Sequence, residues 1–134
     1  MSQTTTTPTD LDDATTAVDT YLAMWDEADP AARLALVERA WAPEGRYADP
    51  VQEAAGHDAL SAMAAGIQAT YPGHAFRRTS GVDRHHDAVR FDWALIGPDG
   101  ATVVAGVDVG VLGADGRFVH ILGFFGPAPA IDAG

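Results

Sequence analysis

The stretch Arg46-Tyr47-Ala48-Asp49-Pro50-Val51 lies between two helical patterns and interrupts them with a short extended run. Because a proline disfavours helical backbone in the residue before it, Asp49 is expected to be extended. An extended run over residues 46–50 that ends in Asp-Pro would direct one carboxylate out of the helical layer and into a cavity. The stretch therefore predicts both a change of structure and a candidate acid.

The composition fits one folded domain with a hydrophobic core. The chain has 134 residues, 47% of them hydrophobic, and this length is ordinary for a single domain. It contains no cysteine, which excludes disulfides, thiolate nucleophiles and cysteine-based metal sites. All eight basic residues are arginine, so a Schiff-base mechanism through lysine is also excluded.

The charge and the hydropathy pattern exclude further classes of protein. The net charge of −11 argues against nucleic acid and anionic membrane surfaces as partners, and it is typical of an acidic cytoplasmic protein. No apolar run approaches the ~20 residues that a membrane span requires. Residues 1–8 have neither a basic region nor an apolar core, so we expect a disordered leader there and no signal peptide.

Three segments in the first half show the three-and-four spacing of amphipathic helices. Between the first and second, Asp29 is predicted to be an N-cap and Pro30 to occupy the first helical position. Pro72-Gly73 is expected to stop the third. The helices are expected over residues 9–27 (the first residue being 9 or 10), 31–41 and 57–70, with residues 42–45 ending the second and a loop at 52–56.

After Gly73 the spacing of apolar residues changes to two, which is typical of strands. In the clearest case, Val89, Phe91 and Trp93 alternate with polar residues. Gly97-Pro98-Asp99-Gly100 has the composition of a hairpin turn. Four antiparallel strands are expected over residues 74–82, 88–96, 102–112 and 117–125, with turns at 83–87 and 113–116.

Helices followed by strands predict an α+β domain, with three N-terminal helices packed on one face of a curved, mainly antiparallel sheet. Residues 103–112 are apolar on both faces. The face turned away from the helices therefore also needs cover, most simply by a second copy of the chain. We expect a leader at residues 1–8, a single domain over residues 9–126 and an irregular tail at residues 127–134.

This order of elements, with Tyr47-Ala48-Asp49-Pro50-Val51 after the second helix and a closing Phe124-Phe125-Gly126, resembles the nuclear transport factor 2-like superfamily and its cystatin-like cone fold. Within it, the chain is similar to the SnoaL-like and ketosteroid-isomerase-like group over about residues 11–126. The resemblance implies a deep apolar pocket between helices and sheet and, usually, a homodimer. It implies no single function, because this fold hosts isomerases, cyclases, hydrolases, dehydratases and non-catalytic binders.

Three positions match the pattern of bacterial ketosteroid isomerase. Asp49-Pro50-Val51 matches its general base, and Tyr21-Leu22-Ala23 matches the context of its oxyanion tyrosine. Asp108, which follows Val103-Val104-Ala105-Gly106-Val107, matches its protonated oxyanion aspartate. The chain departs from that pattern in a shorter loop after the Asp-Pro pair and in Ala64, which lies where the family has a tyrosine that supports the oxyanion tyrosine.

Each of the three residues also has a structural interpretation. Asp49 is compatible with a turn or a cap, because Asp-Pro is common in turns. A mid-strand carboxylate at Asp108 would pair with an arginine, cap a backbone bulge, or raise its pKa on burial. The resemblance to polyketide cyclases alternatively implies that Asp108 is the base. Tyr21 is compatible with a core tyrosine whose hydroxyl is satisfied.

Aromatic and apolar side chains are expected to form partly the core and partly the wall of a pocket for a flat hydrophobic ligand. Gly106 and Gly123, on the expected inner face of the sheet, would leave room beside Asp108. The predicted substrate-binding residues are Trp25, Trp41, Tyr47, Met63, Ile67, Phe76, Phe91, Trp93 and Phe125.

The histidines do not predict a metal site. His85-His86-Asp87 lies in an expected turn, and neighbouring residues of an extended chain point to opposite sides. His74 is a candidate for the cavity, whereas alternation places His120 on the far side of its strand.

These observations predict a cofactor-independent enzyme that transfers a proton next to the carbonyl of a hydrophobic small molecule, through an enolate. Asp49 is the predicted base, and Tyr21 and Asp108 are the predicted donors to the oxyanion. Isomerisation and aldol-type cyclisation both pass through an enolate and stay open. Two further alternatives are a protein that binds a small molecule without catalysis and a hydrolase whose aspartates activate water on an epoxide.

Overall fold

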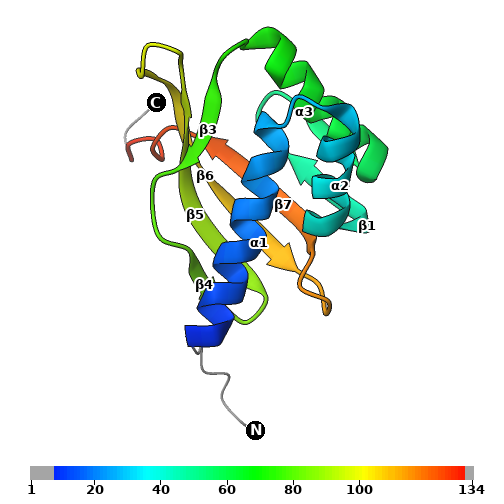
Figure 1. Ribbon diagram of the computed structural model, residues 1–134. Helices are drawn as coiled ribbons and strands as arrows, with labels where there is room; N and C mark the ends of the chain where they lie inside the picture. Colours follow the sequence, from blue (N-terminus) through cyan, green and yellow to red (C-terminus); the bar gives the residue numbers. More distant parts are fainter. Residues whose placement is uncertain (1–7, 132–134) are drawn as a thin grey trace, which may run out of the picture.

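The computed structural model describes residues 8–131, with side chains from residue 13 onward, and shows an α+β arrangement with three N-terminal helices, as predicted (Figure 1). The first helix already includes Pro8, and the rest of the predicted leader lies outside the described residues. The elements are α1 (Pro8–Asp26), α2 (Pro30–Ala40), β1 (Trp41–Ala48), β2 (Glu53–Ala55), α3 (His57–Thr70), β3 (Ala75–Arg78), β4 (Asp83–His85), β5 (Ala88–Ile96), β6 (Thr102–Leu112) and β7 (Phe118–Phe125).

The start of α2 follows the predicted capping pattern. Asp29 has extended backbone, and its side chain accepts a hydrogen bond from the Ala32 amide at 2.9 Å, with Pro30 as the first helical residue. The predicted end of this helix was wrong, because Trp41 is the first residue of β1. Pro43 disfavours helical backbone at Ala42, and Trp41 pairs with Phe118 of β7, so the chain turns directly from helix into strand.

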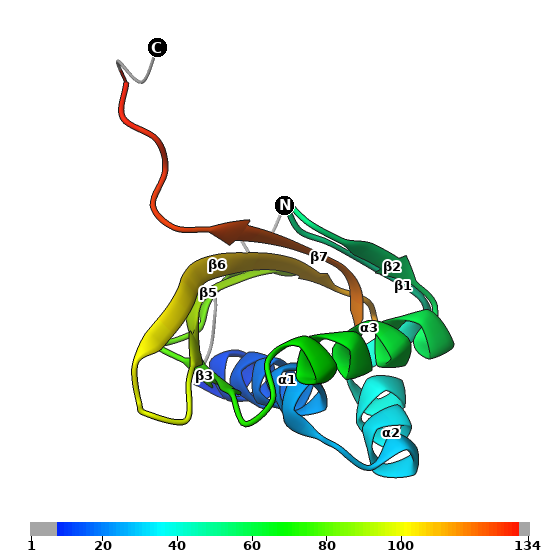
Figure 2. The ribbon, with the colours of Figure 1, turned by 90° about the horizontal axis from the view of Figure 1, so that it is seen from above.

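The described strands form one mixed sheet in the order β2-β1-β7-β6-β5-β3, with β4 also pairing with β5. The predicted antiparallel order of β5, β6 and β7 is confirmed, but β1 joins β7 in parallel. Figure 2 shows this sheet arching over α1 and α3. Asp49, which follows β1, thereby lies beside Gly123 of β7.

Two short strands lie where a loop and a turn were predicted. Glu53–Ala55 forms β2 against β1, and Asp83–His85 forms β4 against β5. The predicted strand over residues 74–82 is reduced to Ala75–Arg78, because the Ser80 hydroxyl accepts the Asp92 amide hydrogen bond at 2.8 Å in place of a backbone carbonyl. Such short segments carry too few residues to show an alternating pattern.

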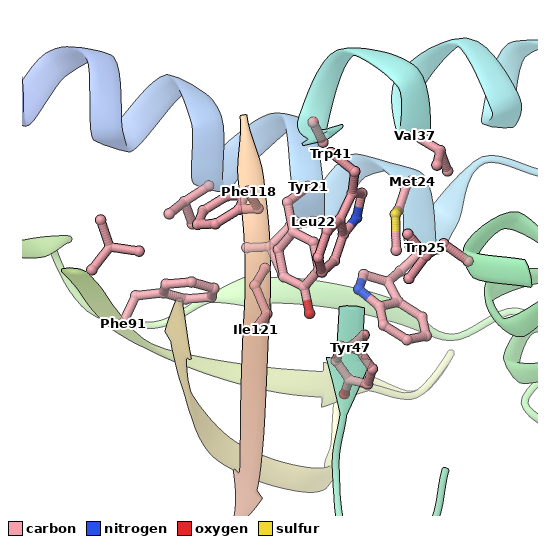
Figure 3. Close-up of a cluster of buried hydrophobic side chains, with 14 of the residues drawn as sticks. Tyr21, Leu22, Met24, Trp25, Val37, Trp41, Tyr47, Phe91, Phe118 and Ile121 are labelled. Atoms are coloured by element: carbon pink, nitrogen blue, oxygen red, sulfur yellow. The ribbon is translucent and has the colours of Figure 1, made fainter. Parts of the chain in front are cut away.

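Tyr21 lies at the centre of the hydrophobic core. Its ring makes edge contacts with Trp25, Trp41, Phe91 and Phe118, with centroid separations of 5.8–6.3 Å. Figure 3 shows the ring among these side chains, with the hydroxyl at the end turned away from α1. The packing therefore fixes α1 against three strands and directs one phenolic hydroxyl toward the sheet.

The outer face of β6 and β7 carries apolar side chains that the single chain leaves exposed. Val109 lies opposite Leu122, and Val107 lies opposite Phe124, whose exposed fraction is 53%. The helices cover only the other face of the sheet (Figure 2). None of the described helices is both long and apolar enough to cross a membrane.

Candidate active site

A cavity of about 150 Å³ lies between α1, α3 and the inner face of the sheet. This is about ten times the ~15 Å³ that one water requires. Six of the predicted pocket residues line it, namely Trp25, Tyr47, Ile67, Phe76, Trp93 and Phe125, together with the three predicted catalytic residues Tyr21, Asp49 and Asp108. The remaining lining residues, which sequence reasoning missed, are Leu22, Val51, Gln52, Tyr71, Leu95 and Val104.

Three predicted wall residues lie outside this lining. Trp41 and Phe91 are fully enclosed in the core, where both pack against the Tyr21 ring. Met63 is partly buried and packs against the core from α3. The sequence pattern identified these side chains as apolar, but alternation within one element does not separate a wall of the cavity from the layer behind it.

Asp108 is buried in the middle of β6, with an exposed fraction of 2%. The Tyr21 hydroxyl donates to its Oδ2 at 2.8 Å, and the Trp93 indole N–H donates to its Oδ1 at 3.0 Å. Burial raises the pKa of Asp108 to about 7; the two hydrogen bonds oppose this shift, and the charge of Asp49 adds to it. The carboxyl group can therefore gain or lose a proton near neutral pH.

Asp49 follows β1 and is held by local hydrogen bonds. The Tyr47 hydroxyl donates to its Oδ2 at 2.6 Å, while the backbone amides of Val51 and Gln52 donate to its Oδ1 at 2.9 and 3.0 Å. The turn interpretation of Asp49 is thus confirmed, because Pro50 folds the chain back so that two amides reach the carboxylate. The same side chain also lines the cavity.

Gly123 on β7 shows how closely the two acids approach a common point. A Cβ atom added there would lie 2.9 Å from Asp108 Oδ1, 3.2 Å from the Tyr47 hydroxyl and 3.3 Å from Asp49 Cβ. The prediction that this glycine leaves room beside Asp108 is confirmed. Gly106 instead accommodates the Trp93 ring, which would lie 2.6 Å from a Cβ atom at that position.

Both tyrosines remain protonated. Burial and the charge of Asp108 raise the pKa of Tyr21 well above its usual value and also raise the pKa of Tyr47. Each hydroxyl proton is directed to a carboxylate in the structure, Tyr21 to Asp108 and Tyr47 to Asp49. Tyr47 and Trp93, predicted only as walls, are therefore also hydrogen-bond donors within the site.

Of these two hydrogen-bond donors, only Tyr47 had a signal in the sequence. Tyr47 precedes Asp49 by two residues in an extended run, so their side chains share a face. Trp93 gave no such signal, because it meets Asp108 only through the pairing of β5 with β6. Ala64, the position of the absent supporting tyrosine, is buried in α3 and brings no hydroxyl, whereas Trp93 gives Asp108 a second donor.

The histidines lie outside the cavity lining. His74 contacts the Pro72 carbonyl in the loop after α3, so its prediction as a cavity residue was wrong. His85, the last residue of β4, contacts His86 in the turn that follows, and both are exposed. Within residues 8–131 no group of three potential ligands is arranged to hold a metal ion.

Several proteins of known structure are similar to this chain. A candidate isomerase of the SnoaL-like family from Agrobacterium tumefaciens is 37% identical, with a TM-score of 0.82; the match covers 87% of this chain and 99% of that one. A candidate SnoaL-like polyketide cyclase from Jannaschia is 22% identical, with a TM-score of 0.65, over 92% of this chain and 91% of that one. A protein with a cystatin-like fold from Methylobium petroleophilum is 16% identical, with a TM-score of 0.70, over 92% and 82% of the two chains.

No family model matches the sequence, and no curated protein matches it either. The Agrobacterium protein is nevertheless similar over nearly its whole length at an identity that indicates common descent. The more distant structures share the cystatin-like, nuclear transport factor 2-like fold. The chain therefore belongs to the SnoaL-like family and has the nuclear transport factor 2-like fold.

Proposed function

We propose that this protein is a cofactor-independent enzyme that transfers a proton next to the carbonyl of a hydrophobic small molecule, as an isomerase or a cyclase acting through an enolate. The observation that carries the proposal is that Asp49 and Asp108 line one aromatic cavity in different surroundings. Two carboxyl groups held in different environments can divide acid and base work between them. The candidate isomerase and the candidate cyclase of the same fold are consistent with it.

The hydrogen bonds indicate how the work is divided. When Asp108 is ionised, it accepts the Tyr21 and Trp93 protons, and neither is free for a ligand oxygen. When Asp108 is protonated, the same three groups carry one proton more, and one O–H becomes available to the cavity. Asp108 and Tyr21 therefore act as oxyanion donors only in the protonated state of Asp108.

Asp49 is the base in this scheme. Its carboxylate takes the proton from the carbon next to the carbonyl; the C–H bond breaks, an O–H bond forms on Asp49, and the electron pair delocalises onto the carbonyl oxygen. That oxygen receives a hydrogen bond from Asp108 or Tyr21. Returning the proton to another carbon completes an isomerisation, whereas attack of the enolate on a second carbonyl completes a cyclisation.

The proposal is tested with a small β,γ-unsaturated ketone such as 3-cyclohexenone, whose conjugation is followed by ultraviolet absorbance. We expect the native chain to accelerate the reaction, Asp49→Asn to slow it by roughly 10²–10⁴-fold, and the exposed-carboxylate variant Glu44→Gln to leave it unchanged. If Asp49→Asn and Asp108→Asn both retain the native rate, the proposed site is wrong.

A second candidate is a protein that binds a small molecule without catalysis. It is favoured by the hydrogen bonds to Asp108, because they direct the Tyr21 and Trp93 protons to this carboxyl group and leave neither for an oxyanion. Tight binding of an equilenin-like phenol together with no turnover of any ketone would support it. Consumption of an epoxide instead would indicate hydrolysis through the same aspartates.

The outer face of β6 and β7 supports a homodimer as part of the proposal. Its exposed apolar side chains, Leu122 and Phe124 among them, form a continuous strip on two paired strands. A second copy would bury this strip, and a stable interface needs roughly 800 Å² from each partner. Light scattering after size exclusion should give twice the mass of the chain, and Phe124→Glu should give monomers.

A further inference from the structure

The charged groups of the cavity are all acidic. Asp49 and Asp108 line it, whereas none of the arginine and histidine side chains within residues 13–131 does. Within the described part of the chain, no salt bridge reaches either carboxyl group. Enclosing a carboxylate without a cationic partner is costly, so a ligand that brings a positive charge into the cavity would offset part of that cost.

The walls of the cavity suit a cation as well. Trp25, Tyr47, Phe76 and Trp93 line it and contact one another at steep angles, with centroid separations of 5.4–5.7 Å between neighbours. The four rings are therefore not parallel to their neighbours, and all of them border the same space. The face of an aromatic ring attracts a cation, and the attraction is greatest where water is excluded.

From this juxtaposition of aromatic rings and carboxyl groups without a cationic partner we infer that the cavity is selective for ligands that carry a cationic nitrogen, such as a cyclic ketone with an ammonium group. The inference rests on the proposed function in that it concerns the substrate of the same cavity. It names a class of substrate that proton transfer through an enolate does not by itself require.

The proposed reaction provides a physical reason for the preference. Proton transfer from substrate to Asp49 conserves charge, so a neutral ketone leaves one net negative charge in the cavity before and after the step. An ammonium group on the substrate makes the sum zero throughout, with Asp108 protonated. Because a net charge is costly in an apolar enclosure, the cationic substrate is favoured in the ground state and in the enolate state.

Three small molecules of similar shape and different charge test the inference: 2-phenylethylammonium, 2-phenylethanol and phenylacetate. Trp25 and Trp93 line the cavity, so tryptophan fluorescence reports binding, and calorimetry confirms it. We expect the ammonium ion to bind at least about tenfold more tightly than the alcohol, and phenylacetate to bind more weakly than either.

The dependence on pH gives a second readout. The groups that face Asp108 are Tyr21 from α1, Trp93 from β5 and, after β1, Asp49 with its donor Tyr47. The two tyrosines and the tryptophan stay uncharged. Ionisation of Asp108 adds a negative charge as the pH rises from 6 to 8, so the ammonium ion should bind more tightly at pH 8.

Matched variants locate the preference. Asp49→Asn and Asp108→Asn keep the shape of each side chain and remove its charge, so at least one should bring the affinity of the ammonium ion toward that of the alcohol. Glu44→Gln removes an exposed carboxylate from β1 and should leave the preference intact, which separates the cavity from the overall charge of −11.

The inference is overturned if the alcohol binds as tightly as the ammonium ion, if the ammonium ion does not bind at millimolar concentration, or if both asparagine variants keep the preference. Failure of the proposed function has a different outcome. Isomerisation of a neutral ketone without a preference for ammonium ligands supports the proposed enzyme function and refutes this inference. A preference for ammonium ligands without turnover of any ketone supports this inference and refutes the proposed enzyme function.

Discussion

Asp49 and Asp108 line the same cavity, but their surroundings differ. Asp49 lies in a turn after β1, where two backbone amides and the Tyr47 hydroxyl hold it. Asp108 lies in the middle of β6, where only side chains from other elements reach it. The turn stabilises a carboxylate through local donors, whereas burial on the strand penalises the charge. One fold therefore places the same residue type in two different environments.

The sharpest test of this difference is to remove each charge in turn. Asp49→Asn removes the only proposed base and should lower kcat for 3-cyclohexenone by roughly 10²–10⁴-fold. Asp108→Asn keeps N–H donors at the oxyanion position, so we expect a loss of only about tenfold. The reverse order of effects in a steady-state assay would exchange the two roles and make Asp108 the base.

The raised pKa of Asp108 should also make the free energy of unfolding depend on pH. Because the pKa of Asp108 is raised from 3.8 to about 7, the folded state retains a proton between these values that the unfolded state has released. The free energy of unfolding of the native chain should therefore fall from pH 4 to pH 7 relative to Asp108→Asn. At about 1.4 kcal/mol per pKa unit, the difference amounts to a few kcal/mol.

Urea denaturation at a series of pH values measures this difference. Glu44→Gln, which removes an exposed carboxylate, should follow the native curve over the same range. Parallel curves for the native chain and Asp108→Asn would show that folding does not raise the pKa of Asp108.

Gly123 tests whether the two acids meet at one point. In Gly123→Ala, the added methyl group would lie against Asp108, Tyr47 and Asp49, so the site must shift. We expect a destabilisation of roughly 1–3 kcal/mol and a larger loss of turnover than the change in stability explains. Gly66→Ala is the control, because the new methyl group would meet no atom within 4 Å beyond its chain neighbours and its own helix backbone, and an exposed helical alanine stabilises by up to about 1 kcal/mol relative to glycine. Full activity of Gly123→Ala would contradict the proposed geometry.

The smallest expected effect separates the donors to Asp108. The Trp93 N–H stabilises the ionised carboxylate, so Trp93→Phe should raise the pKa of Asp108 further, by roughly one unit. Since activity requires protonated Asp108, the alkaline limb of the pH–rate profile should move to higher pH. Trp41→Phe is the matched control for Trp93→Phe, because the buried Trp41 N–H has no hydrogen-bond partner within residues 8–131. It should lower stability without moving the alkaline limb of the pH–rate profile.

Much of the fold was predictable because its long elements carry regular patterns. The helix over residues 57–70 and the strands over 88–96 and 102–112 have the predicted bounds. The prediction was wrong where a single contact decides the structure. Trp41 continues a helical pattern, yet its pairing with Phe118 makes it a strand residue. Strand β4 exists only because β5 provides a partner for it.

The sequence by itself determined the residue types and their local geometry: an acid before a proline, a tyrosine on an apolar helical stripe and an aspartate between valines. Local patterns do so because backbone preferences and side-chain periodicity act over a few residues. Only the tertiary structure decided that Trp93 and Tyr21 donate to Asp108 and that no arginine or histidine side chain of the described residues lines the cavity. These features depend on how strands pair and how deeply a carboxyl group is buried, and burial, through its cost to a charge, is what separates Asp108 from Asp49.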